Sequence, residues 1–125
     1  MGTLNPTFGR HIILNTSFED TPTGKLPNGF YIVYDGKGVS YQIVTDKISF
    51  SGRKSLQIWG VPGWCANVHY DFDVFRFKWI EVSWKMYAQE GNDGWISFIN
   101  QNGAAWGWGY CGLGFAKKNG YFRIC

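Results

Sequence analysis

The chain has 125 residues and a net charge of +3, and 45% of its residues are hydrophobic against 17% charged. This balance excludes an intrinsically disordered chain, and the lack of about 20 consecutive apolar residues excludes a membrane-spanning helix. The basic residues are scattered rather than clustered, so we expect neither nucleic acid nor a membrane as a partner.

The expected organisation is a short leader followed by one domain. Residues 1–10 form a polar leader that we expect to be flexible. Residues 11–125 show no linker, low-complexity block or internal repeat, which predicts one domain. The 17 glycines and the 19% of aromatic residues favour short strands joined by tight turns over long helices.

Apolar and polar residues alternate with a period of two through most of this domain, as is typical of half-buried strands. Dipeptides that favour turns separate the alternating segments. We therefore expect an all-β fold, an antiparallel β-sandwich with Phe18, Leu56 and Ile58 in its core. The strands are expected, in chain order, at 12–18, 30–34, 39–45, 55–59, 66–73, 78–88, 95–98, 106–115 and 120–124.

Three ordered motifs in the first half of the chain resemble those of a known family. They are an N-x-x-F-E segment at 15–19, a P-N-G-F segment at 27–30 and an S-G-x-x-S-L-x-I segment at 51–58. Together they resemble the N-terminal half of jelly-roll carbohydrate-binding modules, with the likeness strongest over residues 12–60. The resemblance implies a jelly-roll sandwich that binds an oligo- or polysaccharide without catalysis. It implies an extracellular location if the chain belongs to a glycan-active protein, although we find no signal peptide in this sequence.

Members of that family often hold a structural calcium ion near the first strand. The resemblance places its ligands at Glu19 and Asp20, together with main-chain oxygens near Ser51 and Lys54. A further ligand usually comes from an acidic residue in the last strand, and the sequence stops before such a strand. The alternative is that both acids are ordinary solvated turn residues.

The glycan site is expected on aromatic side chains that project from the sheet. In a strand, Trp106, Trp108 and Tyr110 share one face, and flat aromatic faces stack well on the C–H faces of sugars. Polar contacts would come from short side chains on one face of another strand. The remaining candidate ligand-binding residues are Trp95 and Tyr87 for stacking, and Asn67, His69 and Asp71 for hydrogen bonds. In the alternative, Trp106 and Trp108 lie in the core and the polar triple is an ordinary exposed face.

We do not expect an enzyme, because the inventory of catalytic groups is small. The chain has two histidines and no G-x-S-x-G motif, and its carboxylates form no recognisable glycosidase signature. Another possible role is a structural or assembly domain that uses exposed aromatics as a protein–protein interface. Cys65, Cys111 and Cys125 contain no C-x-x-C pair, so a zinc site is unsupported. Two states of the cysteines remain open: one disulfide with one free thiol, or three reduced thiols.

The C-terminal segment predicts self-association. Residues 120–124 form an expected strand, and such modules usually add one or two strands after it, so the sandwich is expected to be incomplete there. An uncovered strand edge is a template for pairing with another chain. We therefore expect a homodimer in which the C-terminal strands meet, with Cys125 near the contact.

Overall fold

The computed structural model describes residues 11–72, 79–89, 91, 93–99, 110–119 and 121–124. The chain divides into two compact units, Met1–Ser83 and Trp84–Cys125. The expected leader at 1–10 lies outside the described residues, and a single domain over 11–125 stays a prediction.

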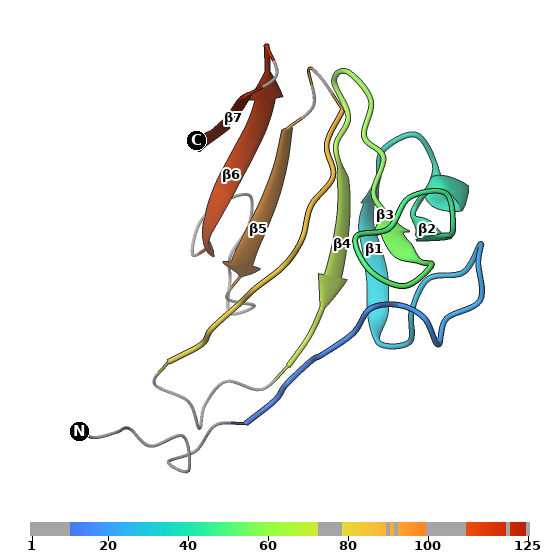
Figure 1. Ribbon diagram of the computed structural model, residues 1–125. Helices are drawn as coiled ribbons and strands as arrows, with labels where there is room; N and C mark the ends of the chain where they lie inside the picture. The colour runs from blue at the N-terminus through green and yellow to red at the C-terminus, as the bar shows by residue number, and fades with distance from the viewer. Residues whose placement is uncertain are drawn as a thin grey trace. The chain divides into compact units, whose positions relative to one another are not determined.

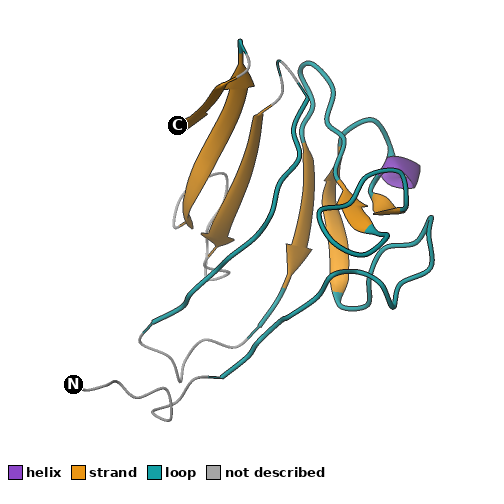
Figure 2. Cartoon of the chain, in the orientation of Figure 1, coloured by secondary structure: helices purple, strands orange, loops and turns teal. Residues whose placement is uncertain are grey.

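The first unit contains two small antiparallel sheets (Figure 1). In one, β1 (Phe30–Asp35) pairs with β4 (Ala66–Tyr70). In the other, β2 (Ile43–Thr45) pairs with β3 (Ser55–Gln57). A single 3-10 turn, η1 (Val39–Tyr41), lies between β1 and β2 in the chain and is the purple segment in Figure 2.

The β1–β4 ladder explains why a glycine precedes β1. Phe30 lies opposite Tyr70, with 5.0 Å between the ring centroids. Gly29 has φ +84°, and a Cβ there would lie 2.9 Å from the Tyr70 ring, so a side chain would strain the backbone and displace the ring. Further along, the register shifts between Ile32 and Tyr34, which is a β-bulge.

The most buried side chains of the first unit belong to β2 and the residue just before it. Val44 is completely buried, Gln42 is 1% exposed and Thr45 is 8% exposed. The segment after residue 20 lies along β2, where Val44 O accepts from Gly24 N and Val44 N donates to Lys25 O, both at 2.8 Å. The central position of β2 therefore follows from hydrogen bonding to β3 and to the Gly24–Lys25 segment.

The second unit contains a three-stranded antiparallel sheet in the order β5-β6-β7 (Figure 1). Its strands are β5 (Asp93–Ile99), β6 (Tyr110–Lys118) and β7 (Tyr121–Ile124). Lys118 pairs with Tyr121, so an Asn-Gly dipeptide joins β6 to β7. Asn119 has φ +53°, the left-handed conformation that a two-residue hairpin turn requires and that asparagine tolerates.

Antiparallel, all-β structure is thus confirmed for the described residues, while several strand boundaries were predicted wrongly. No strand forms at 12–18, where Phe18 adopts φ +66° and leaves the extended region. The segment 39–45 is split, because backbone hydrogen bonds from Tyr41 to Gly38 and from Gln42 to Val39 close the turn η1 before β2 begins.

Two further expectations were also wrong. Residues 79–88 alternate in sequence but form no strand, and Figure 2 draws them as loop. Alternation describes which faces a strand would present, whereas a strand also needs a regular ladder of hydrogen bonds, which alternation does not specify. Ile58, expected in the core, is 53% exposed because it lies just beyond the end of β3.

Candidate functional site

A buried amide joins two loops of the first unit. The Gln42 Nε2 group donates to the carbonyl oxygens of Asp35 at 2.9 Å, Trp59 at 3.0 Å and Gly38 at 3.2 Å. Its Oε1 accepts from the Trp59 N–H at 2.8 Å. Burial of an amide is tolerated when its donors and acceptors are all satisfied, as they are here. Gln42 therefore fixes the loop after β3 against the turn after β1.

Glycine permits this close approach. Gly36 has φ +53°, and a Cβ there would clash with the Trp59 carbonyl oxygen and lie 2.8 Å from the Ala66 Cβ. The loop then reverses at Pro62-Gly63, where Val61 and Trp64 exchange two backbone hydrogen bonds of 2.9 and 3.0 Å. Proline followed by a glycine with positive φ (+83° at Gly63) is the residue pair of a type II turn.

The tryptophans at the two ends of this loop are both partly exposed, and each contacts a tyrosine. Trp59 is 44% exposed and Trp64 is 46% exposed. Trp59 meets Tyr41 edge-to-face at 5.3 Å between centroids, and Trp64 meets Tyr34 in the same way at 5.4 Å. Edge-to-face contacts hold each indole by its partner ring. We call these four residues, with Asp35 and Lys37, the Trp59–Trp64 surface.

Two charged side chains complete the Trp59–Trp64 surface. Trp64 Nε1 donates a 2.7 Å hydrogen bond to Asp35 Oδ1, which satisfies the polar edge of the indole. The Lys37 ammonium lies 4.0 Å from the Trp59 ring centroid and 4.7 Å from that of Tyr41. A cation over two ring faces is attracted by both quadrupoles. The surface therefore presents two oriented indoles with one carboxylate and one ammonium beside them.

The polar triple expected on β4 is partly assembled around a tyrosine that sequence reasoning missed. Tyr31 lies opposite His69, with 5.5 Å between ring centroids, and its hydroxyl donates to Asp71 Oδ1 at 2.8 Å. The hydrogen bond to Asp71, followed by burial and the carboxylate charge, raises the pKa of Tyr31. Asn67 lies opposite Tyr34, beyond the bulge. His69 Nε2 is buried and has no hydrogen-bond partner within the described part of the chain.

Only part of the aromatic platform expected near the C-terminus lies among the described residues. Trp106 and Trp108 lie outside the described residues. Tyr110 pairs with Ile99, and Trp95 pairs with Gly114, so both belong to the β5–β6 ladder. Tyr87 is 66% exposed and lies in a loop of the same unit.

The Glu19 carboxylate of the first motif is bound by backbone N–H groups of the third motif. Its Oε1 accepts from the backbone N–H groups of Arg53 and Lys54, both at 2.9 Å. These two hydrogen bonds lower the pKa of Glu19, and the positive charges of the same residues act in the same direction. Gly52 has φ +63°, and a Cβ there would lie 2.8 Å from the Glu19 Cδ. The glycine of the S-G-x-x-S motif therefore leaves room for the glutamate of the N-x-x-F-E motif.

The residues present around Glu19 do not fit a calcium ion. The Lys54 ammonium donates to the main-chain oxygens of Glu19 at 3.1 Å and Thr21 at 2.8 Å. Calcium requires six to eight oxygen ligands, and an ammonium on two of the nearest oxygens repels it. Asp20 is exposed, and no group of three or more potential metal-ligating side chains occurs among the described residues.

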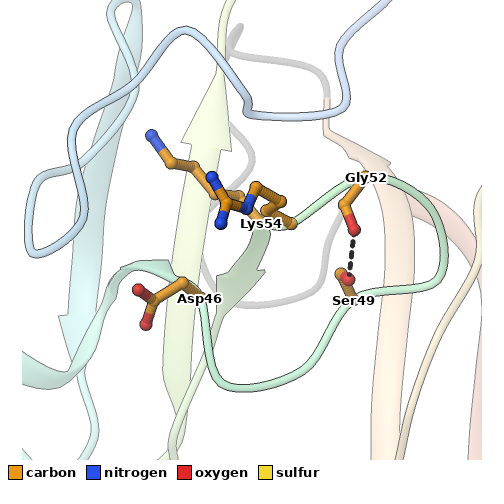
Figure 3. Close-up of a pocket in the computed structure, with 5 residues that line it drawn as sticks. Asp46, Ser49, Gly52 and Lys54 are labelled. Carbon is orange, nitrogen blue, oxygen red and sulfur yellow. Dashed lines mark hydrogen bonds between the residues drawn. The ribbon is translucent and has the colours of Figure 1, made fainter.

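A hollow of about 470 Å³ lies beside this cluster (Figure 3). One wall is the turn in which Ser49 Oγ donates to the Gly52 carbonyl oxygen at 3.0 Å. The lining residues are Asp46, Ser49, Gly52, Arg53 and Lys54. The lining is polar and contains no aromatic ring, so the hollow lacks the exposed indoles of the Trp59–Trp64 surface.

Comparison with known proteins identifies no relative. No family model matches the chain, and no curated protein or solved structure matches it. Within the described ranges, no helix is long and apolar enough to cross a membrane. Cys65 is exposed and forms no disulfide with another described residue.

Proposed function

We propose that this chain is a non-catalytic carbohydrate-binding domain, a jelly-roll module that binds an oligo- or polysaccharide by aromatic stacking. The observation that carries the proposal is the Trp59–Trp64 surface, in which two half-exposed indoles are each fixed by a second ring. An indole already held in place loses little conformational entropy when a ligand stacks on it. A sugar ring offers a flat C–H face of matching size.

The charged groups of this surface suit the hydroxyl groups of such a ligand. Asp35 can accept hydrogen bonds from hydroxyls, and Lys37 can donate to them. Asp35 already orients Trp64 through the 2.7 Å hydrogen bond, so the acceptor and the stacking ring are held together. A binding site with apolar faces and a few placed polar groups is the usual design for small hydroxylated ligands.

Contacts between the three family motifs support the jelly-roll assignment. Glu19 of the first motif accepts from backbone N–H groups of the third, beside Gly52. Phe18 of the first motif meets Phe30 of the second, with 6.2 Å between ring centroids. These contacts give a physical reason why the three motifs, which are distant in sequence, occur together in one chain.

We extend the proposal to two further groups of residues. Trp95, Trp106, Trp108, Tyr110 and Tyr87 are proposed to form a second stacking platform on the second unit. Asn67, His69 and Asp71 are proposed to contribute hydrogen bonds, with Tyr31 as an additional donor or acceptor. The proposed assembly is a homodimer.

A wild-type screen tests whether the function is glycan binding at all. Isothermal titration calorimetry against β-glucans, xylans and mannans should give saturable binding to at least one class. Light scattering on the same sample should give the mass of a dimer. Absence of binding to every class would remove the proposal.

A structural or assembly domain is the second candidate, and a specific observation favours it. Several large apolar side chains are strongly exposed in the first unit, including Trp79 at 90%, Phe50 at 75% and Ile12 at 71%. Aromatic and aliphatic side chains are also common in the cores of protein–protein interfaces. A stable dimer that protects these side chains from solvent, with no glycan affinity, would support this role.

A further inference from the structure

We propose that the ammonium group of Lys54 is a built-in structural cation, which holds the segment after Phe18 against the turn at Gly52 and makes a metal ion unnecessary there. This inference concerns how the first unit is stabilised, and it does not depend on the glycan proposal. The Lys54 clamp is defined here as Glu19, Thr21, Gly52, Arg53 and Lys54.

Lys54 contacts Glu19 in two independent ways. Its backbone N–H donates to Glu19 Oε1 at 2.9 Å, and its side-chain ammonium donates to the Glu19 main-chain oxygen at 3.1 Å. The same ammonium donates to Thr21 O at 2.8 Å. One residue thus fixes both the side chain and the backbone of a segment more than thirty positions away.

The oxygen atoms that accept hydrogen bonds from Lys54 are of the types that coordinate a hard cation. Main-chain carbonyl oxygens and a carboxylate are the ligand types of calcium sites in proteins. In the Lys54 clamp the carbonyl oxygens instead accept charge-assisted hydrogen bonds from an ammonium, which are about twice as strong as neutral ones. The side chain of Lys54 is half-buried, so these bonds are less screened by water than those of a surface lysine.

The Glu19 carboxylate is stabilised by groups of the protein and does not require a metal ion. Two backbone N–H groups point at Glu19 Oε1, and Gly52 is the residue type that leaves room for that oxygen. Lys54 and Arg53 add positive charge close to the carboxylate. A divalent ion at the same place would have to overcome repulsion from these charges.

Thermal unfolding of the full chain tests the proposal. We would measure the Tm of the wild type in millimolar CaCl2 and in EDTA, and then the Tm of Lys54→Met, which keeps the aliphatic stem without the ammonium. Lys47→Met is the matched control, because the exposed Lys47 side chain makes no hydrogen bond within the described part of the chain. We expect the same wild-type Tm in both buffers, a drop of at least about 5 °C for Lys54→Met and a much smaller change for Lys47→Met.

A second measurement keeps the test decisive if Lys54→Met fails to fold. In the wild type, nitrogen-15 NMR should detect the Lys54 ammonium protons, protected from exchange with water by their carbonyl partners. The proposal is overturned if calcium raises the wild-type Tm and EDTA reverses the effect. It is also overturned if the two methionine variants lose equal stability, or if the Lys54 ammonium exchanges as fast as that of an exposed lysine.

Discussion

Trp64 and Asp35 are 29 residues apart, and the Trp64 indole N–H donates a 2.7 Å hydrogen bond to Asp35 Oδ1. This bond fixes a half-exposed ring at the edge of a sheet. It links β1, which ends at Asp35, to the loop that precedes β4. The orientation of the proposed stacking surface therefore depends on an acid that itself lies within that surface.

Replacement of Asp35 should separate its role as an acceptor from its charge. We expect Asp35→Ala to shift the Trp64 indole N–H resonance toward the position of a free indole, because the ring loses its acceptor. Asp35→Asn keeps a carbonyl oxygen and should shift the resonance much less. NMR spectra of both variants check this, and equal shifts would show that the hydrogen bond does not hold the ring.

Gln42 should be far more important for stability than another glutamine that bonds to a backbone carbonyl. Gln42→Leu removes four hydrogen bonds and leaves the Trp59 N–H without its acceptor, whereas the three carbonyl oxygens still accept from backbone N–H groups of Lys37, Gly38 and Tyr41. A lost hydrogen bond costs roughly 1 kcal/mol and an unsatisfied buried group roughly 1–3 kcal/mol. Some groups will recover water, so we expect a loss of about 3 kcal/mol in the free energy of unfolding.

Gln57→Leu is the matched control for that change. Gln57 donates one hydrogen bond, to Tyr41 O at 2.9 Å, so we expect a loss of about 1 kcal/mol. Urea denaturation of the wild type and both variants gives the comparison. If the two losses are equal, Gln42 does not join the loops as described.

Glu19 should make stability depend on pH in the acidic range. Its pKa is lowered in the folded state below the ordinary value of 4.5, so the folded state binds fewer protons than the unfolded state in that range. The stabilisation is present above the unfolded pKa and is lost as the pH falls through the folded pKa. We expect the free energy of unfolding to fall between about pH 5 and pH 3.

Glu19→Gln should flatten this pH dependence, because an amide does not titrate. Asp20→Asn is the control, since the exposed Asp20 side chain has no hydrogen bond among the described residues. Denaturation curves at several pH values provide the slopes. A wild-type slope in Glu19→Gln would assign the effect to other carboxylates.

Tyr31 should titrate above its ordinary range while Asp71 is present. Asp71 accepts a hydrogen bond from the Tyr31 hydroxyl and its charge opposes the phenolate, so the pKa of Tyr31 is raised. Asp71→Ala should return the pKa toward 10.0. Carbon-13 NMR of labelled tyrosine over alkaline pH measures this, with Asp46→Ala as an exposed-acid control. An unchanged Tyr31 pKa in Asp71→Ala would contradict the hydrogen bond.

The parts of the fold that follow from local pattern could be predicted from the sequence. Alternation correctly indicated a strand at β4, the segment 30–34 was correctly expected to form a strand, and an Asn-Gly dipeptide marked the β6–β7 hairpin. Alternation failed at 79–88, because a strand needs a partner that periodicity does not specify. It also failed at 39–45, where hydrogen bonds of the turn compete with the ladder.

Less of the candidate site than of the fold could be predicted from the sequence. Trp59 contacts Tyr41 in a loop that the buried amide of Gln42 fixes, and Trp64 contacts Tyr34. A glutamine in sequence gives no sign that it will be buried. The closest signal was the Pro62-Gly63 turn between two tryptophans. The partnership of Glu19 with residues 52–54 was better indicated, since both motifs were recognised as a set.

The affinity of Trp64→Ala for a glycan that binds the wild type decides whether glycans stack on the Trp59–Trp64 surface. Trp79→Ala is the matched control, because Trp79 is 90% exposed and has no ring or hydrogen-bond partner within the described residues. We predict at least a tenfold loss for Trp64→Ala by calorimetry, or about 1.4 kcal/mol, with Trp79→Ala close to wild type. Wild-type affinity in Trp64→Ala, or equal losses in the two variants, would contradict stacking at the Trp59–Trp64 surface.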